Sequence, residues 1–225
     1  PEHCRPEITD VTQLQINDGY HPLLGKPVKN SIWLQERSAL ITGSNMAGKT
    51  TFIKMIGINV IFGRSLGFCL SSKAVLPKSG VKASIQNEHS VESGKSNYFI
   101  ELETIRSFIT DTVSGNCKIF LIDELFSGTN TVERLAIARA VLEALGKEAI
   151  VLATTHDIEL QLDLANFYDL FYFQEDPNID GYFDWKVRPG KAIHRNAIQL
   201  LEREGFPKDI VDSASAYAIK YSNLM

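Results

Sequence analysis

The sequence predicts an α/β fold in which a mainly parallel sheet is covered by helices, with an antiparallel edge and a C-terminal helical pair. Three short runs have a continuous apolar centre, as is typical of strands buried on both faces of a parallel sheet. They are SALIT at 38–42, KIFLI at 118–122 and AIVLA at 149–153. Helical patterns alternate with these runs, and the 225 residues suffice for a sizeable core.

The first half of the chain places a helix directly after a glycine turn. Glycines and prolines interrupt residues 5–34, which predicts short strands and turns. The strand at 38–42 ends at Gly43. After Lys49 the apolar residues recur at helical spacing: Phe52, Ile53, Ile56, Val60 and Ile61.

The second half adds four further elements. Residues 97–109 predict an amphipathic helix with Ser96 at its N-cap position. Its apolar face is expected to hold Tyr98, Leu102, Ile105 and Ile109. Residues 131–145 predict another helix, ended by Gly146 at the C′ position. Residues 169–187 indicate an antiparallel edge or hairpin. Two short helices, divided at Gly205-Phe206-Pro207, are expected within residues 192–221.

Composition limits the classes of function. No run approaches the roughly 18 apolar residues of a membrane span, and the N-terminus has no apolar signal segment. Three scattered cysteines (Cys4, Cys69 and Cys117) fit a reducing compartment, so we expect a cytoplasmic protein without membrane contact. The net charge of −4 argues against a chain whose main function is to bind nucleic acid. We therefore expect DNA contacts in other parts of a longer protein, of which this chain, opening without methionine, is the C-terminal piece.

Residues 43–50 match the phosphate-binding loop pattern, a glycine and four residues followed by Gly-Lys-Thr. Such a turn points backbone N–H groups at phosphate oxygens, and the following helix adds its positive N-terminal end. Lys49 is expected to reach the β- and γ-phosphates, and Thr50 to ligate Mg²⁺. About one chain in a hundred would match by chance, so a merely structural turn is the weaker alternative. The predicted nucleotide-binding residues, for ATP or ADP, are Gly43, Ser44, Asn45, Met46, Ala47, Gly48, Lys49, Thr50 and Thr51.

Polar residues follow the other two buried strands. Functional sites in parallel sheets lie at the carboxyl ends of the strands. Asp123 is therefore expected in the outer coordination sphere of Mg²⁺, and Glu124 is expected to orient or polarise the attacking water. Taken alone, these acids could also cap the next loop. His156 follows the third strand; a lone histidine is more often structural, but at this edge we expect it to donate to the γ-phosphate.

Residues 92–96 (ESGKS) look like a second phosphate loop but fail the pattern. The first glycine would fall at position 89, which is His89. What remains is a polar turn before a helix N-terminus, itself an anion site. Because Lys49 already serves the nucleotide of this chain, we expect the turn to serve a nucleotide bound to a second subunit.

Three motifs in order resemble the ATPase domain of the MutS DNA mismatch-repair family: TGSNMAGKTTF, LIDELFSGTNT and ATTHDIEL. SGKSNYFIELE is similar to that family's signature segment, GYHPLL to its opening segment and GFPKDIVDSA to its closing helices. The resemblance implies a P-loop NTPase of ABC-ATPase type, with residues 1–225 as a single ATPase domain. In that domain, residues 1–27 would be an entry segment that follows missing upstream domains. Residues 28–191 would form the nucleotide-binding core. Residues 192–225 would form C-terminal helices at a dimer contact.

The same resemblance implies a head-to-tail dimer, either a homodimer or a MutS-like heterodimer. Each composite site would take Lys49, Thr50, Asp123, Glu124 and His156 from one subunit, and the catalytic Ser96 in trans from the other. Residues 28–32 would flank the adenine. The dimer would couple nucleotide state to a clamp, built by upstream domains, on mismatched DNA, and downstream repair proteins would respond to it.

Several positions depart from the family pattern. Ala47 replaces a second glycine, which is tolerable only at a negative φ. Leu125-Phe126-Ser127 replaces Ile-Gly-Arg, Lys95 replaces an arginine, and residues 81–93 form a shortened segment. Two alternatives follow: a MutS relative that acts on other DNA structures, and a nucleotide-gated interaction module with little turnover. The intact Glu124 argues against the second.

Overall fold

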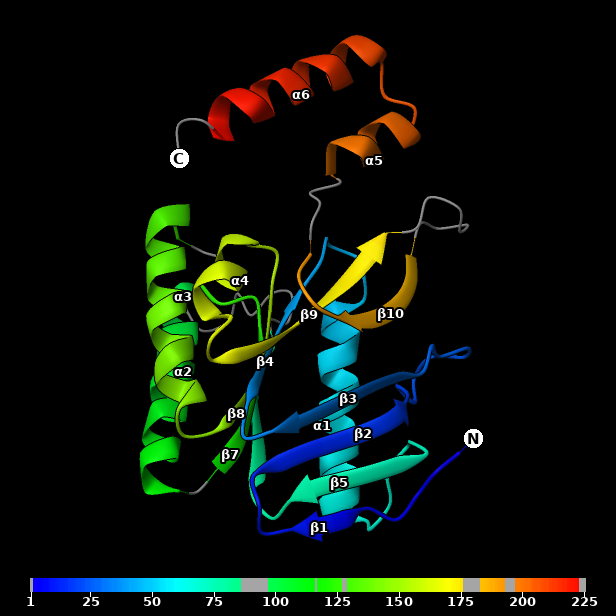
Figure 1. The fold of residues 1–225 in the computed structure, drawn as a ribbon, viewed down its shortest axis with the longest axis vertical. Helices are drawn as coiled ribbons and strands as arrows, with labels where there is room; N and C mark the ends of the chain where they lie inside the picture. The colour runs from blue at the N-terminus through cyan, green and yellow to red at the C-terminus, as the bar shows by residue number, and fades with distance from the viewer. Residues whose placement is uncertain are drawn as a thin grey trace. The chain divides into compact units, whose positions relative to one another are not determined.

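The computed structural model describes residues 2–85, 97–115, 117–126, 129–175, 183–192 and 197–222. The chain divides into two compact units, residues 1–192 and 193–225. The first unit contains both sheets and every predicted site residue, and it is described first (Figure 1).

A six-stranded sheet, the large sheet, forms the centre of the first unit. Its strand order is β10-β9-β4-β8-β7-β6. Neighbouring strands are parallel except β9 and β10, which form an antiparallel edge. The predicted α/β class, parallel sheet and antiparallel edge are therefore confirmed, whereas β6 was not predicted. The strands are β4 (Ser38–Thr42), β6 (Gly80–Ser84), β7 (Cys117–Asp123), β8 (Ile150–Thr155), β9 (Tyr168–Glu175) and β10 (Phe183–Pro189).

A four-stranded sheet, the small sheet, is formed by the N-terminal strands with β5, in the order β1-β5-β2-β3. The short strands predicted over residues 5–34 are confirmed. Their assembly into a separate sheet was not predicted, because β5 joins them from a distant part of the sequence. The strands are β1 (Glu7–Thr9), β2 (Gln13–Gly19), β3 (Asn30–Gln35) and β5 (Lys73–Pro77).

Helices cover both faces of the large sheet. Helix α1 lies between the two sheets, and α2, α3 and α4 pack on the opposite face (Figure 1). In the described parts of the chain, no helix combines the length and apolar character needed to cross a bilayer. The helices of this unit are α1 (Lys49–Ser65), α2 (Asn97–Ser114), α3 (Thr131–Gly146) and α4 (Glu159–Leu164).

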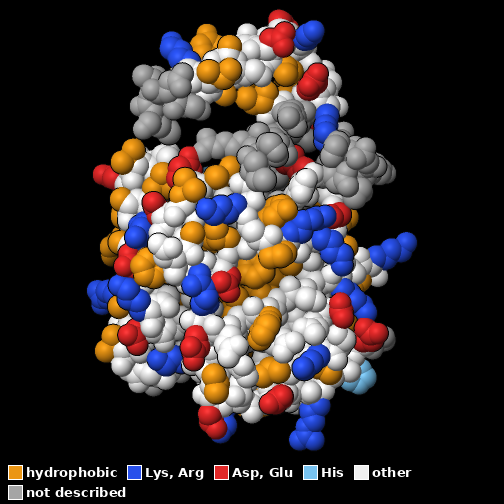
Figure 2. All heavy atoms as spheres, in the orientation of Figure 1, with side chains coloured by type: hydrophobic (Ala, Val, Ile, Leu, Met, Phe, Trp, Pro, Cys, Tyr) orange, Lys and Arg blue, Asp and Glu red, His pale blue; other side chains and the backbone are white. Residues whose placement is uncertain are grey.

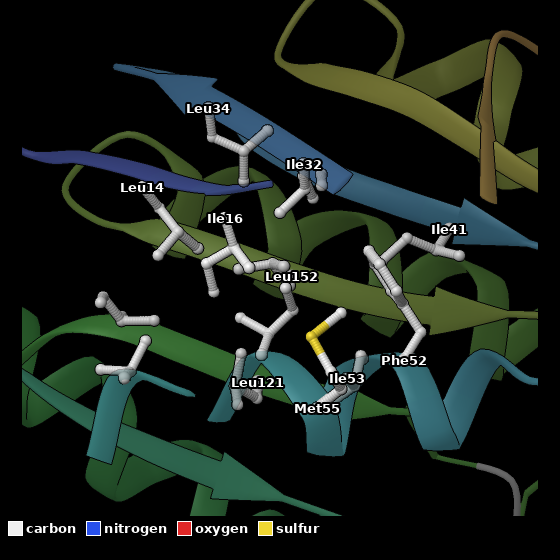
Figure 3. Packing of buried hydrophobic residues seen from close by; sticks show 14 of the residues in the cluster. Leu14, Ile16, Ile32, Leu34, Ile41, Phe52, Ile53, Met55, Leu121 and Leu152 are labelled. Atoms are coloured by element: carbon white, nitrogen blue, oxygen red, sulfur yellow. The ribbon is translucent and has the colours of Figure 1, made fainter. Parts of the chain in front are cut away.

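Side-chain alternation along the strands produces two hydrophobic clusters. In β7, Ile119 and Leu121 face α1 and the small sheet, while Phe120 and Ile122 face α2 and α3. Figure 3 shows the first cluster, in which residues of β2, β3, β4, β7 and β8 surround the buried side of α1. Sheets buried on both faces need apolar residues at every strand position, which explains the continuous apolar runs.

The predicted apolar faces of two helices were partly wrong. In α2 the buried apolar residues are Ile105 and Phe108, whereas Leu102 and Ile109 are exposed. The helix carries two adjacent apolar stripes, and packing against Phe120 selects the stripe that contains Phe108. In α1, Phe52, Ile53, Ile56 and Val60 are buried as expected, but Ile61 is half exposed.

The predicted C′ role of Gly146 was also wrong. Gly146 is the last residue of α3 and has no positive φ; the C-cap is Lys147 in right-handed geometry. A Cβ atom at Gly146 would lie 2.9 Å from Cε2 of Tyr168. The glycine is therefore explained by close packing between α3 and β9 rather than by helix termination.

The second unit contains α5 (Ala197–Arg203) and α6 (Lys208–Ser222), which contact each other. The predicted division at Gly205-Phe206-Pro207 is confirmed. Gly205 has φ +77, and the N–H of Ile210 donates to the carbonyl of Pro207 over 3.0 Å. A left-handed glycine follows the end of the first helix, and Pro207 stands immediately before the first residue of the second; both residues are common at such places.

Candidate functional site

The glycine turn joins the end of β4 to the start of α1. Gly43, Met46 and Gly48 have positive φ values of 152°, 70° and 102°. Ala47 does not, so the backbone condition for an alanine at this position is met. Gly48 precedes α1 without a side-chain cap, and the first N–H groups of the helix face the turn.

Lys49 extends back along the turn. Its Nζ donates to the carbonyls of Gly43 over 2.8 Å and Ser44 over 3.0 Å, and lies 3.5 Å from Oε1 of Glu124. Only 5% of its side chain is exposed. Burial lowers the pKa of Lys49, while the charges of Glu124 and Asp123 act against that shift. A buried cation at the mouth of the turn suits an anionic ligand.

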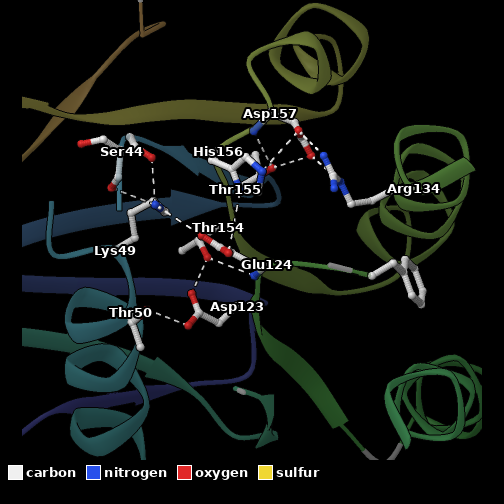
Figure 4. Close-up of polar contacts among 12 residues, drawn as sticks. Ser44, Lys49, Thr50, Asp123, Glu124, Arg134, Thr154, Thr155, His156 and Asp157 are labelled. Atoms are coloured by element: carbon white, nitrogen blue, oxygen red, sulfur yellow. Dashed lines mark hydrogen bonds and ion pairs between the residues drawn. The ribbon is translucent and has the colours of Figure 1, made fainter. Parts of the chain in front are cut away.

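Asp123 ends β7 and is held by hydroxyl groups from two elements. Thr50 Oγ1 donates to Oδ2 over 2.7 Å, and Thr154 Oγ1 donates to Oδ1 over 2.5 Å (Figure 4). Asp123 is 8% exposed. Thr50 and Asp123, predicted as a magnesium pair, therefore lie together, and Thr154 is an unpredicted partner.

Glu124 has a strained backbone, with φ 54°. A left-handed conformation costs a residue with a Cβ atom about 1–2 kcal/mol. Hydrogen bonds from its N–H to the carbonyl and hydroxyl of Thr154, over 3.2 and 3.3 Å, hold this conformation. Strain of this kind is concentrated at functional sites, and here it turns the carboxylate towards Lys49 and His156.

His156 follows β8 at the same edge of the sheet. Its Nδ1 lies 3.8 Å from Oε2 of Glu124. This contact lowers the pKa of Glu124 and raises that of His156; burial opposes both shifts. The charge of Asp157 adds to the rise at His156, and Arg134 acts against it. Glu124 and His156, which were predicted separately from two strand ends, therefore lie side by side.

A cavity of about 370 Å³ lies at this edge of the sheet. Of the predicted residues, Gly43, Ala47 and His156 do not line it, and Ser96 lies outside the described residues. Ser44 Oγ is buried with no hydrogen-bond partner in the described structure, as expected of a group that awaits a ligand. The lining residues are Ser44, Asn45, Met46, Gly48, Lys49, Thr50, Thr51, Asp123 and Glu124.

A second cavity, of about 320 Å³, begins on the other side of the same turn and is mostly apolar. It is lined by Val28, Phe52 and Trp185 among others, together with Met46, Gly48 and Thr51, which both cavities share. In the space-filling view, hydrophobic side chains are exposed between β3 and the β9–β10 hairpin (Figure 2).

Trp185 is a residue of the second cavity that the sequence did not indicate. It has φ 51°, and its Cδ1 would lie 3.2 Å from a Cβ atom at Gly48. Asn30 holds this part of β10, because its Nδ2 donates to the carbonyl of Trp185 over 2.9 Å and its Oδ1 accepts from the N–H of Val187 over 2.9 Å. Of the predicted adenine segment 28–32, Val28 and Asn30 line this cavity.

Phe126 lies in the loop after Glu124 and contacts α2. It is buried, with φ 57°, at the position where the resemblance led us to expect glycine. Its N–H donates to Oε1 of Glu101 over 2.6 Å, and its ring lies 6.0 Å from that of Tyr98. The loop that carries Glu124 is therefore fastened to the first turns of α2.

Comparison with known proteins gives a consistent picture. The family model of MutS domain V matches residues 39–222. The chain belongs to the MutS family. It is 30% identical over 220 residues to the DNA mismatch repair protein MutS of Thermus aquaticus, covering 95% of this chain and 27% of that protein. The MutS protein of Natronomonas pharaonis is 28% identical over 228 residues, covering 95% of this chain and 26% of that protein.

This member of the MutS family thus spans about a quarter of the length of these relatives. The match begins at Ala39 in β4 and includes α6, so it extends across both compact units. It contains the glycine turn and the carboxyl ends of β7 and β8, where the polar residues of the candidate site lie.

Proposed function

We propose that this chain is the ATP-binding and ATP-hydrolysing domain of a MutS-like DNA mismatch-repair protein, with a P-loop NTPase fold of ABC-ATPase type. One observation carries the proposal: Lys49 and Thr50, at the start of α1, line one cavity together with Asp123 and Glu124 at the end of β7. His156, after β8, lies beside Glu124 at the same edge of the sheet. Cation, hydroxyl and carboxylate groups at such an edge are the set that phosphoryl transfer requires.

The two cavities suit the two ends of a nucleotide. The polar one offers Lys49, the orphaned Ser44 hydroxyl and the positive end of α1 to the phosphates. The apolar one offers the Trp185 indole and Val28 to the base. Each has a volume typical of ligand sites, about 300–1,000 Å³. Because they meet at Met46, Gly48 and Thr51, one molecule can occupy both.

Thr50 and Asp123 suit Mg²⁺. Among the described residues there is no group of three or more His, Cys, Asp or Glu side chains placed to hold a metal. Mg²⁺ is commonly bound by one or two carboxylates, with phosphate and water as its other ligands. When bound, the ion would neutralise phosphate charge. Thr154 keeps the Asp123 carboxylate oriented for that role.

Glu124 and His156 are proposed as the catalytic groups. Glu124 would orient the attacking water and accept its proton, and His156 would donate to the terminal phosphate. In the structure the Glu124 carboxylate is in contact with Lys49 Nζ and His156 Nδ1. A phosphate that draws both side chains towards itself would free the carboxylate for water, so ligand binding and activation of Glu124 are linked.

At the level of the whole protein, we propose a homodimer or MutS-like heterodimer with composite sites. Ser96 would complete the site of the partner subunit. DNA would be held by domains beyond this sequence, downstream repair proteins would respond to the nucleotide state, and the work would take place in the cytoplasm. A MutS relative that acts on other DNA structures is the alternative, favoured by the missing arginine at Ser127.

The deciding experiment measures ATP turnover per subunit as the concentration of the chain rises. For a shared site, specific activity climbs with concentration, and Ser96→Ala stays low while still binding ATP. Ser107→Ala, an exposed serine of α2, is the matched control and behaves like the unchanged chain. Activity that is independent of concentration and of Ser96 would rule out the composite site. A chain that binds no ATP would rule out the proposed function itself.

A further inference from the structure

Asp157 lies beside the candidate site but has no role in it so far. It directly follows His156 and is 8% exposed. Arg134, in the first turn of α3, donates from Nε to its Oδ2 over 3.0 Å and from Nη2 to its Oδ1 over 2.8 Å (Figure 4). Arg134 and Asp157 side chains are 13% and 10% exposed. A bidentate, largely buried ion pair of this kind fixes both the position and the plane of the carboxylate.

A second contact fixes the backbone of Asp157. Its N–H donates to the hydroxyl of Thr155 over 3.0 Å. The carboxylate is thus held from α3, and the main chain from the end of β8. Asp157 Oδ1 then lies 3.7 Å from Nε2 of His156, on the side of the ring opposite Glu124.

The His156 ring therefore has a carboxylate near each nitrogen. A neutral imidazole carries one N–H, so one nitrogen would direct a lone pair at a carboxylate. A ring protonated at both nitrogens directs an N–H to each side. Among the described residues, the other charged groups around this cluster are Lys49 from α1, beyond Glu124, and Arg134 from α3. The charge of Arg134 opposes protonation of His156 but is offset by its own pair with Asp157.

We infer that Asp157, anchored by Arg134, is a positioning residue that holds His156 as a proton donor at both nitrogens. The ring then makes a charge-assisted hydrogen bond by exchanging Glu124 for a terminal phosphate oxygen, while Asp157 keeps its place. The positioning of His156 by Asp157 requires no ligand and can be tested on this chain by itself. The role of His156 towards phosphate rests on the proposed function, and it would favour the binding of ATP over that of ADP.

The first test is an NMR titration of ¹⁵N-labelled histidine in the 225-residue chain. The His156 signal is assigned by its loss in His156→Gln. Asp157→Asn should move the His156 midpoint to lower pH, because one of its two carboxylates is gone. Asp169→Asn is the matched control: it removes a carboxylate paired with Arg37 over 2.6 Å on β9 and should leave the midpoint unchanged. An unchanged midpoint in Asp157→Asn would overturn the inference.

Arg134→Gln distinguishes two effects of Arg134 on His156: its positive charge and its anchoring of Asp157. If Asp157 stayed in place, loss of the neighbouring cation would raise the His156 midpoint. If Arg134 acts by holding Asp157, the carboxylate moves away and the midpoint falls. A fall supports the inference, and a rise or no change overturns the anchoring step. Should Asp157→Asn fail to fold, Asp157→Ser, which also removes the carboxylate, takes its place in the titration with the same expected fall.

The second test compares the affinities for ATP and ADP. Asp157→Asn should reduce the preference for ATP by about fivefold, the difference between a charged and a neutral donor to phosphate. A preserved preference, with a shifted His156 midpoint, would reject the phosphate role of the cluster. Absence of nucleotide binding in the unchanged chain would reject the proposed function instead, and the titration would be unaffected.

Discussion

The Nζ atom of Lys49 lies 3.5 Å from Oε1 of Glu124, so the residue proposed to hold phosphate is paired with the residue proposed to act on water. Two backbone carbonyls take the remaining donors of Lys49. A phosphate that enters the cavity must therefore replace at least one of these partners. Phosphate binding is therefore an exchange of partners at Lys49 rather than a simple addition.

Lys49→Ala should weaken ATP binding at least about tenfold, because each charge-assisted hydrogen bond contributes about 1.5–3 kcal/mol. The loss should be smaller for ADP if Lys49 faces the terminal phosphate. Titration with a fluorescent ATP analogue and with its ADP counterpart measures both. Lys54→Ala, further along α1 and not among the residues that line either cavity, is the control. Unchanged ATP affinity in Lys49→Ala would reject the phosphate assignment.

Glu124→Gln should retain ATP but slow its hydrolysis by about 10²–10⁴-fold, the usual contribution of a general base. Since the amide no longer competes for Lys49, ATP should also bind more tightly. Single-turnover hydrolysis measures the first effect and equilibrium binding the second. Sedimentation with saturating ATP should show a trapped dimer. A monomer under that condition would count against the composite site, and normal turnover would count against the role of Glu124.

Much of the site could be predicted because parallel strands end at one edge of a sheet. That rule alone brings Asp123, Glu124 and His156 together with the glycine turn. The pair Arg134–Asp157 could not be predicted, since it joins a helix start to a strand end and has no periodic or motif signal. The same holds for Trp185, which reaches Gly48 only through the β9–β10 hairpin.

The fold, like the site, could be predicted from the sequence only in part. Continuous apolar runs revealed the three central strands, because complete burial leaves no other pattern. In α2, by contrast, apolar residues lie on two adjacent stripes, and only the contact with Phe120 decides that Phe108 is buried and Ile109 exposed. Periodicity cannot distinguish such stripes without knowledge of the neighbouring element.

Glu101 gives a prediction about pH. Burial raises its pKa, and the hydrogen bond from the Phe126 N–H acts against that shift. The folded state therefore binds this proton more tightly than the unfolded chain does. The associated stability is complete below the ordinary glutamate range and is lost as pH rises through the raised pKa.

Glu101→Gln keeps an acceptor oxygen for Phe126 but has no charge to bury. The variant should therefore be more stable than the unchanged chain at neutral pH, and this gain should shrink as the solution becomes acidic. Urea unfolding over a series of pH values measures the difference in free energy of unfolding. Glu148→Gln, at an exposed site, should show no such trend. A gain that is the same at every pH would contradict the explanation from burial.

Gly146→Ala tests the close approach of α3 and β9. In an exposed helix interior this change stabilises by about 0.5–1 kcal/mol. Here the new Cβ would lie 2.9 Å from Cε2 and 3.1 Å from Oη of Tyr168. Tyr168 is buried, and its hydroxyl donates to the carbonyl of Leu142 over 2.8 Å, so the ring cannot move aside without losing that bond.

The substitution should therefore destabilise the fold by about 1–3 kcal/mol, the usual cost of overpacking. Urea unfolding measures it. Gly80→Ala, where an added Cβ meets no atom within 4 Å, is the control and should be close to neutral. In the Tyr168→Leu background the smaller side chain leaves room, so Gly146→Ala should lose most of its cost there. An equal cost in both backgrounds would mean that backbone geometry, rather than the contact with Tyr168, requires glycine at this position.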